Sequence, residues 1–304
     1  MSLSSNDLPP PARAEEAPSG VLTRLSPLTR RLIAGNASPF TFTGTCSYIV
    51  GEGEVAIIDP GPADESHLEA LLAALAGERV SHIVVTHSHR DHCAGVAALK
   101  RKTGALVVGA RAHVPPEGGP AGLDAAHDLD YAPDVALADG ERIEGRGFTL
   151  ESVATPGHAA NHLCFALAQE NALFSGDHVM AWSTSIVAPP DGSMADYMAS
   201  LEKLRLRDEA IYWPGHGGPV REPQRYVRAL AHHRRQREAA IVVKLEAGEA
   251  GIPEIVARVY AGLSPALVGA ASLSTLAHLE DLIARGLVAS DGPPALSARF
   301  RLAG

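Results

Sequence analysis

The chain has 304 residues, enough for one large domain and a smaller one, and its 46% hydrophobic and 20% charged residues are ordinary for a globular protein. The formal net charge of −9 disfavours a general nucleic-acid binder, which normally presents a basic surface to phosphates. No apolar run reaches the about 18 residues that cross a bilayer, so no membrane partner is expected.

The N-terminal segment and the cysteines indicate the cellular setting. Residues 1–20 are rich in Pro, Ser, Ala and Glu and lack the basic start and apolar stretch of a secretory signal, so a disordered leader is expected. Cys46, Cys93 and Cys164 form no CxxC pair, and an odd number is a poor disulfide framework. A reducing, cytoplasmic location is therefore predicted.

Short strands alternate with helices over residues 21–221. Apolar alternation and β-branched runs predict strands at 41–50, 54–60, 80–87, 147–155, 162–169, 172–177 and 210–216. Apolar residues three and four apart predict helices at 65–78 and 93–104. Because the strands occur both as hairpins and in βα units, we expect two mixed sheets covered by helices.

The composition changes near residue 222, where a second domain, 222–304, is expected to begin. Three helices are predicted at 222–248, 252–262 and 265–286, the first with Pro223 in its first turn. Two short extended segments follow within 287–302, around an Asp-Gly-Pro-Pro turn. Three helices followed by a hairpin is the order of a winged-helix domain.

The stretch THSHRDHCAG, residues 86–95, places three histidines and an aspartate within six positions. His87 and His89 are two apart on an extended segment, so both imidazoles project from one side. Asp91 and His92 follow where the strand gives way to a helix. Imidazole and carboxylate bind divalent metals without redox chemistry, and four such ligands exceed the need of one tetrahedral zinc with an open position. A site that binds two metal ions is therefore considered.

Three later strands also end in a histidine or an aspartate. His158 and His216 each follow a strand and a Pro-Gly pair, and Asp177 comes directly after an apolar strand. Taken singly, each residue could be an ordinary turn residue. As a set with the first cluster, they indicate a site assembled along one edge of the sheets, where loops are held by a rigid scaffold.

These residues and their order resemble the metallo-β-lactamase superfamily. The motif HxHxDH reads His87-Ser88-His89-Arg90-Asp91-His92 and is followed in order by His158, Asp177 and His216. Asp59, after the strand at 54–60, matches the first motif of that family as a residue that supports the ligands. The resemblance implies an α+β fold, an αββα sandwich with a two-metal centre, most often zinc, with iron or manganese as alternatives.

The resemblance also implies a role for each ligand. His87, His89 and His158 would hold one metal; Asp91, His92 and His216 would hold the other, and Asp177 would bridge them. Zinc β-lactamases place a cysteine or serine where this chain has Asp177. The aspartate resembles instead the glyoxalase II-type thioesterases, the lactonases and the RNA- or phosphodiester-cleaving enzymes, and the C-terminal winged helix resembles the lactamase-beta-2-like group.

A two-metal centre of this kind indicates hydrolase activity. Two zinc ions lower the pKa of a shared water, and the resulting bridging hydroxide would attack an ester, thioester, lactone or phosphodiester. Asp91 could orient the hydroxide as well as bind metal, and Asp177 would hold both ions. Protonation of the leaving group needs a further acid, for which His162 and His178 are candidates. Cys93 is interpreted as a small buried hydrophobe.

Helix 222–248 carries a basic stripe, defined by Arg225, Arg228, His232 and Arg235, which are three and four residues apart. The stripe is either a solvated face or a surface that holds an anionic substrate beside the metals. Helix 265–286 has Glu280 and Asp281 against Arg285 alone, so binding of duplex DNA is not expected.

Three functions remain open from the sequence. A two-zinc hydrolase acting on a small anionic substrate is favoured, with single-stranded RNA as a further substrate class. A mononuclear iron oxygenase resembling the persulfide dioxygenases is second, and a nucleic-acid-binding regulator that uses the winged helix is third. Metal content separates the first two, and the acidic charge balance opposes the third.

Overall fold

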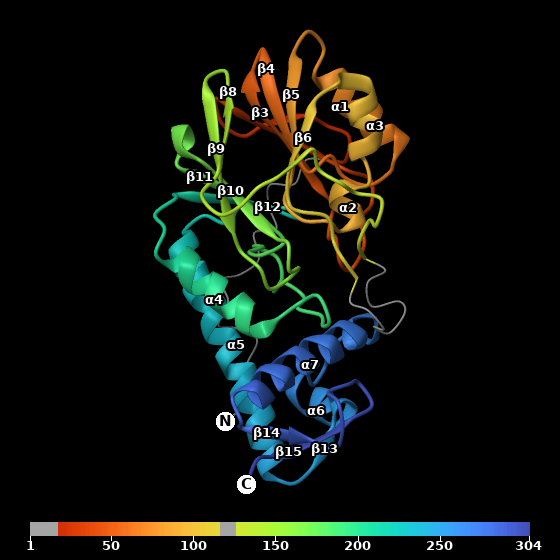
Figure 1. The fold of residues 1–304 in the computed structure, drawn as a ribbon, viewed down its shortest axis with the longest axis vertical. Helices are drawn as coiled ribbons and strands as arrows, with labels where there is room; N and C mark the ends of the chain where they lie inside the picture. The colour runs from red at the N-terminus through yellow and green to blue at the C-terminus, as the bar shows by residue number, and fades with distance from the viewer. Residues whose placement is uncertain (1–17, 116–125) are drawn as a thin grey trace.

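The computed structural model describes residues 18–115 and 126–304, so residues 1–17 of the expected leader lie outside the described part. Within it, the strands form three sheets (Figure 1). The first has the order β1-β2-β3-β4-β5-β6-β7, and the second has the order β12-β11-β10-β9-β8. A small third sheet, β13-β15-β14, belongs to the C-terminal region.

The strands of the first sheet are β1 Thr23–Arg24, β2 Thr29–Ile33, β3 Cys46–Glu52, β4 Glu54–Ile58, β5 Arg79–Val85, β6 Leu106–Gly109 and β7 Val135–Ala136. Those of the second are β8 Arg142–Gly145, β9 Phe148–Ala154, β10 Leu163–Leu167, β11 Ala172–Gly176 and β12 Ile211–Pro214. Both sheets are mixed, as expected: β4 to β7 run parallel, as do β11 and β12, and the other neighbours are antiparallel.

The two sheets pack face to face, with helices on their outer faces. Strand β3 shows why: Tyr48 and Val50 enter the core between the sheets, whereas Ile49 points to the opposite side. Helices α1 Glu65–Ala74 and α3 Val96–Thr103 cover the outer face of the first sheet. Helices α4 Met194–Arg205 and α5 Pro223–Glu246 cover that of the second. The αββα sandwich is confirmed.

The C-terminal region forms the winged helix, confirming that expectation. Helices α6 Ile252–Val259 and α7 Val268–Ala284 pack on β13 Ala250–Gly251 and the hairpin of β14 Val288–Ser290 and β15 Arg299–Leu302. Short 3₁₀ turns within residues 18–115 and 126–304 include η2 Ala168–Glu170 and η3 Pro265–Leu267.

Helix α5 is shared by two cores. Its first half packs Tyr226, Val227 and Leu230 against the second sheet and α4, and its second half packs Ile241 and Leu245 into the winged-helix core. A boundary at residues 221/222 therefore separates the first half of α5 from the core that it covers. In Figure 1 this helix runs from the sandwich into the C-terminal region.

One helical stretch of the described residues, Pro265–Ala284, is long and apolar enough to pass as a membrane span, with a mean hydropathy of 1.2. Its side chains Leu276, Leu279 and Leu282 are buried in the winged-helix core. Helices inside the core of a soluble protein commonly pass the same test, so the stretch is weak support for a membrane contact.

Helix α4 was not expected from the sequence, although its local pattern is clear. Tyr197, Leu201 and Leu204 recur four and three residues apart and are buried, and the Ser193 side chain caps the helix by accepting from the Asp196 backbone N–H. The edge strands β1, β7 and β8 and the inner strands β2 and β6 were also not expected. Their two to five residues give too short a pattern for apolar alternation to be read.

His278 in α7 provides a stability prediction. Its ring is buried, neither ring nitrogen has a hydrogen-bond partner, and burial, reinforced by Arg234, lowers its pKa from 6.5 to about 3. The unfolded chain therefore binds this proton below pH 6.5 while the folded chain does not, so stability is lost as the pH falls. Between pH 7 and pH 5 the loss from this group is about 2 kcal/mol.

We expect His278→Leu to remove that part of the pH dependence. The difference in free energy of unfolding between pH 7 and pH 5, measured by urea denaturation, should be about 2 kcal/mol smaller in the variant. Circular dichroism verifies that the variant is folded. An equal pH dependence in both proteins would contradict a neutral, buried His278.

Candidate metal centre

The seven expected ligands meet at one end of the sandwich. His87 and His89 follow β5, and Asp91 and His92 lie on the short helix α2 Arg90–Cys93. His158 follows β9, Asp177 follows β11, and His216 follows β12. Backbone hydrogen bonds join these ends: Leu163 N–H donates to the Thr86 carbonyl at 2.8 Å, and Gly215 N–H donates to the Gly176 carbonyl at 2.8 Å.

The first group contains His87, His89 and His158. His87 Nε2 lies 3.0 Å from His89 Nδ1, and His158 Nε2 lies 3.1 Å from the same nitrogen. Their ligand atoms all lie within 4.8 Å of one another. The geometry therefore brings together the three histidines that the resemblance assigns to one metal.

The second group contains Asp91, His92 and His216. His216 Nε2 is 3.2 Å from both His92 Nε2 and Asp91 Oδ2. Asp177 lies between the two groups, with Oδ2 at 3.3 Å from His216 Nε2 and 3.7 Å from His158 Nε2. A carboxylate in this position can contact ligands of both groups at once.

The donor set fits divalent metal ions. Five imidazoles turn ring nitrogens toward one another, and the buried Asp177 Oδ1 accepts no hydrogen bond from the described residues. Two metal–nitrogen bonds of about 2.0–2.1 Å at a tetrahedral angle place the nitrogens roughly 3.4 Å apart. The observed separations of 3.0–3.2 Å are close to that value. Nitrogens that converge in this way either share a proton or hold a cation between them.

The outer nitrogens of the histidines are held by oxygen atoms. Asp59 Oδ2 lies 2.9 Å from His92 Nδ1, and the Ile186 carbonyl lies 2.6 Å from His158 Nδ1. Asp59 in turn accepts from the backbone N–H and hydroxyl of Thr86, at 2.8 and 2.7 Å. Its φ of +50° is a strained value for a residue other than glycine. These contacts fix the ring orientations, as is usual at metal sites.

Only glycine fits at position 215, because side chains of the site lie very close to its backbone. A Cβ at this position would lie 2.5 Å from Asp177 Oδ1 and 2.6 Å from His92 Cε1. Any larger residue before His216 would therefore displace the carboxylate between the two groups. This steric limit accounts for the Pro-Gly-His sequence at the end of β12.

The histidines of the cluster differ in the direction in which their pKa values are shifted. Burial and the neighbouring imidazoles lower the pKa of His87 and His89. Burial alone would lower the pKa of His216, but the carboxylates of Asp177 and Asp91 raise it to about 9. Metal ligation requires neutral imidazole, so a bound cation takes the place of a proton at this histidine.

His162 and His178, the two candidates for protonating the leaving group, lie in environments that disfavour proton donation. His162 Nε2 accepts the Asp177 backbone N–H at 3.1 Å, and its Nδ1 lies 2.9 Å from the Thr155 hydroxyl. Both nitrogens are thus engaged, and the ring positions Asp177. His178 is fully buried against the Tyr197 ring at 4.5 Å, and burial lowers its pKa to about 3. This ring is neutral near pH 7 and has no proton to spare.

The basic stripe is not brought to the cluster. Its four residues, Arg225, Arg228, His232 and Arg235, are all exposed on the face of α5 opposite to the buried residues Val227, Leu230 and Arg234. Arg225 pairs with Glu222 at 2.9 Å, and Arg235 pairs with Glu202 of α4 at 3.0 Å. The placement corresponds to a solvated face.

A further His/Asp group, which was not expected, lies beside the centre. Asp191 contacts His113 Nδ1 at 3.2 Å and His127 Nε2 at 3.3 Å, and His127 Nδ1 lies 2.8 Å from the Ser88 hydroxyl. The two rings are stacked, with centroids 3.7 Å apart, so their lone pairs run parallel and do not converge on one ion. The geometry indicates support for the His87–His89 segment. No spacing pattern in the sequence links these three residues.

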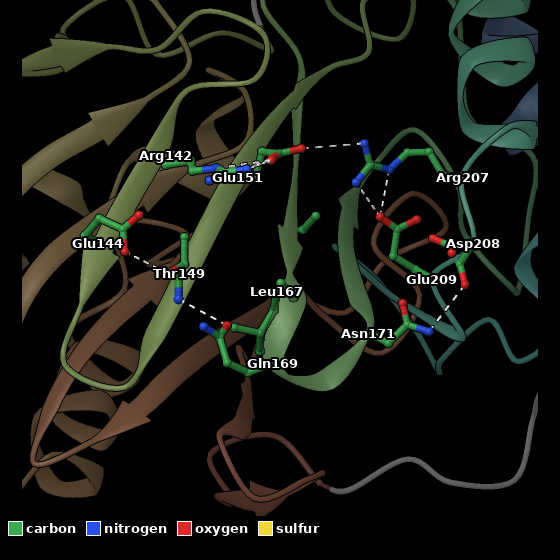
Figure 2. Close-up of a pocket in the computed structure, with 12 residues that line it drawn as sticks. Arg142, Glu144, Thr149, Glu151, Leu167, Gln169, Asn171, Arg207, Asp208 and Glu209 are labelled. Atoms are coloured by element: carbon green, nitrogen blue, oxygen red, sulfur yellow. Dashed lines mark hydrogen bonds and ion pairs between the residues drawn. The ribbon is translucent and has the colours of Figure 1, made fainter.

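A hollow of about 400 Å³ lies over β8, β9 and η2 and contains none of the seven ligands. Figure 2 draws the residues that line it. Its charged side chains pair with one another: Glu151 contacts Arg142 at 3.1 Å and Arg207 at 3.8 Å, and Arg207 also contacts Glu209 at 2.5 Å. We assign this hollow no catalytic role.

Comparison with known proteins agrees with the fold and the motif. The family model described as the metallo-β-lactamase superfamily matches residues 40–216, and that of the β-lactamase-associated winged helix domain matches residues 252–293. Two solved structures share the fold. A metallo-β-lactamase family protein from Thermus thermophilus has a TM-score of 0.74 and 24% sequence identity, over 92% of this chain and 100% of that one. A β-lactamase domain protein from Burkholderia ambifaria has a TM-score of 0.79 and 20% sequence identity, over 97% of this chain and 98% of that one.

Three curated relatives are similar in sequence. The lactamase-like protein adaB of Aspergillus niger is 30% identical, over 77% of this chain and 73% of its own length. The atrochrysone carboxyl ACP thioesterase of Aspergillus fumigatus is 34% identical, over 73% of this chain and 66% of its own length. The β-lactamase-like protein 2 homolog of Caenorhabditis elegans is 31% identical, over 84% of this chain and 83% of its own length. The chain belongs to the metallo-β-lactamase superfamily.

Proposed function

We propose that the chain is a metal-dependent hydrolase that cleaves thioesters with two zinc ions. The observation that carries this proposal is the convergence of imidazole and carboxylate ligands around Asp177. The similarity to a protein named as an acyl-carrier thioesterase supports the bond type. The proposed ligands are His87, His89, Asp91, His92, His158, Asp177 and His216.

The residues of this chain hold and orient the reacting groups. A pair of zinc ions, when bound, makes water a competent nucleophile near neutral pH and polarises the substrate carbonyl. The side chain of Asp91 is 31% exposed, against 10% for Asp177, so Asp91 is the ligand carboxylate most open to an incoming water. Burial alone would raise the pKa of Asp91, but His92 and His216 hold it below its usual range, so it is ionised and can orient a proton of that water.

The leaving group is the reason to prefer a thioester. His162 is committed to Asp177, and His178 is neutral near pH 7, so neither supplies a proton readily. A thiol has a pKa of about 8.5 and leaves well as the thiolate, whereas an alkoxide requires protonation. A site with this arrangement therefore suits the cleavage of a carbon–sulfur bond better than that of an oxygen ester.

The remaining expectations on substrate and setting form part of the same proposal. The buried Arg234, and not the basic stripe, is the cation that could attract a small anionic substrate, because no carboxylate of the described residues forms an ion pair with it. The three cysteines are free and buried, which suits a reducing compartment such as the cytoplasm. Ser274 of α7 contacts the Val187 N–H at 3.4 Å, so part of the helix that would enter a DNA groove faces the sandwich.

The thioester proposal predicts a preference between matched substrates. Zinc-loaded protein should hydrolyse an acyl N-acetylcysteamine thioester at least about 100-fold more efficiently, in kcat/KM, than the matching oxygen ester, since the ester lacks a general acid. Release of free thiol and of acid measures the two rates. A preference for the oxygen ester, a lactone or RNA would contradict the assignment, and one iron per chain with oxygen consumption would indicate the oxygenase.

Asp177→Asn tests the ligand between the two groups. A neutral amide holds two cations poorly, so the variant should keep its circular dichroism spectrum and lose at least about 100-fold in kcat. Asp208→Asn, an exposed carboxylate outside the centre, is the matched control and should retain activity. Near-normal turnover by Asp177→Asn with both metals retained would exclude the bridging role.

Asp59→Asn tests the support of His92. The amide oxygen can still accept from Thr86, but an NH₂ group facing His92 Nδ1 no longer orients the ring as a carboxylate does. Zinc affinity, measured by competition with a chromogenic chelator, should fall about 10- to 100-fold. Asp130→Asn, on an exposed turn, should leave the affinity unchanged, and an unchanged affinity in Asp59→Asn as well would remove Asp59 from the centre.

A further inference from the structure

A pocket of about 160 Å³ lies between the loop that follows Asp177 and the winged helix. One wall comes from the loop, including Trp182 and Ile186. The opposite wall comes from the winged helix, including Tyr260, Leu263, Leu267 and Ala270. None of the residues assigned above to the metals lines it, so its role is separate from ligation.

This pocket adjoins both groups of metal ligands. The carbonyl of Ile186 lies 2.6 Å from His158 Nδ1, which connects one wall to the first group. Trp182 lies over Gly217, next to His216, where an added Cβ would approach the indole at 2.7 Å. Wall residues of the pocket therefore contact one ligand of the first group and the residue next to a ligand of the second.

The walls of the pocket are fixed before any ligand binds. Phe42 stacks on Trp182 with ring centroids 4.9 Å apart. The buried Arg234 donates to the Ser185 carbonyl, and Ser274 contacts the Val187 N–H at 3.4 Å. Preorganised walls let a bound group keep more of its contact energy, because less ordering accompanies binding.

The size and lining of the pocket limit what it can take. A cavity of about 150 Å³ lined by apolar side chains holds one benzene molecule, so 160 Å³ corresponds to about one six-membered ring. Three aromatic side chains, Phe40, Trp182 and Tyr260, line it beside Leu263 and Leu267, while serine and threonine hydroxyls, His233 and the buried Arg234 line the remainder. Aromatic walls favour an aromatic ring through offset or edge-to-face contacts.

We propose that this pocket binds the acyl group of the substrate and selects an acyl group that carries a single aromatic ring. The inference rests on the proposed thioester hydrolysis, and it assigns to the winged helix half of a specificity pocket. Cleavage adds water across the carbon–sulfur bond: the acyl carbon gains the hydroxyl, the sulfur leaves as the thiolate, and the remaining proton of the water is released to solvent.

Two variants change the volume of the pocket in opposite directions. In Ala270→Phe, a ring fills the pocket from the half-buried Ala270. The ratio of kcat/KM for phenylacetyl over acetyl N-acetylcysteamine thioester should fall at least about tenfold, because the substrate ring loses its buried surface. Ala266→Phe, exposed one turn earlier and outside the pocket, should keep the wild-type ratio. Leu263→Ala enlarges the pocket and should raise the ratio for 1-naphthylacetyl over phenylacetyl.

Binding of the product acid gives a measurement without turnover. Calorimetry on the whole protein should show that phenylacetate binds with a dissociation constant at least about tenfold lower than that of acetate. Ala270→Phe should abolish this difference. If phenylacetate binds in this way and no thioester is cleaved, the pocket is supported and the proposed activity fails. If thioesters are cleaved but hexanoyl is preferred to phenylacetyl, or neither Ala270→Phe nor Leu263→Ala alters selectivity, the pocket assignment is overturned and the activity stands.

Discussion

The structure depends on the close packing of five imidazoles and two carboxylates, all buried or half-buried, at one end of the sheet sandwich. Buried polar groups are costly unless they are paired, and imidazole nitrogens 3.0–3.2 Å apart do not satisfy one another without a proton or a cation between them. Asp177, Asp91 and Asp59 supply the negative charge that makes a cation favourable in this place. Divalent metal binding satisfies side chains of these types, and we propose two ions for this set of seven.

The rest of the fold positions this charge. Each ligand follows a strand of one of two packed sheets, so the rigid hydrogen-bonded ladders determine where the loops start. The ligands are then oriented by Asp59, by the Ile186 carbonyl and by His162, none of which is proposed to bind metal. The loop after Asp177 continues into the pocket wall, so the arrangement that holds the metals also shapes the surface that contacts the winged helix.

The convergence of the seven proposed ligands was predictable from the sequence because its signal is local. The HxHxDH motif and the strand-ending residues His158, Asp177 and His216 each carry a recognisable neighbourhood, and the structure brings all of them together. The support from His113, His127 and Asp191 was not predictable. These residues lie in loops without a shared spacing, and only tertiary packing places Asp191 beside both rings.

Periodicity correctly placed the basic stripe on one face of α5, but not next to the metals. The apolar residues Tyr226, Val227 and Leu230 lie on the opposite face, and burial of that face turns the stripe toward solvent. The same helix follows directly after the expected domain boundary at residues 221/222. It contributes apolar residues first to the sandwich core and then to the winged-helix core, and sequence alone does not reveal which partner each half contacts.

The most direct test of this account is a crystal structure of the zinc-loaded protein, with anomalous scattering measured at the zinc edge. The account predicts two anomalous peaks per chain, about 3.5–4 Å apart, with Asp177 between them. One peak should lie within bonding distance of His87, His89 and His158, and the other of Asp91, His92 and His216. A single peak in fully loaded protein, with the Asp177 carboxylate turned away from it, would contradict the two-metal centre.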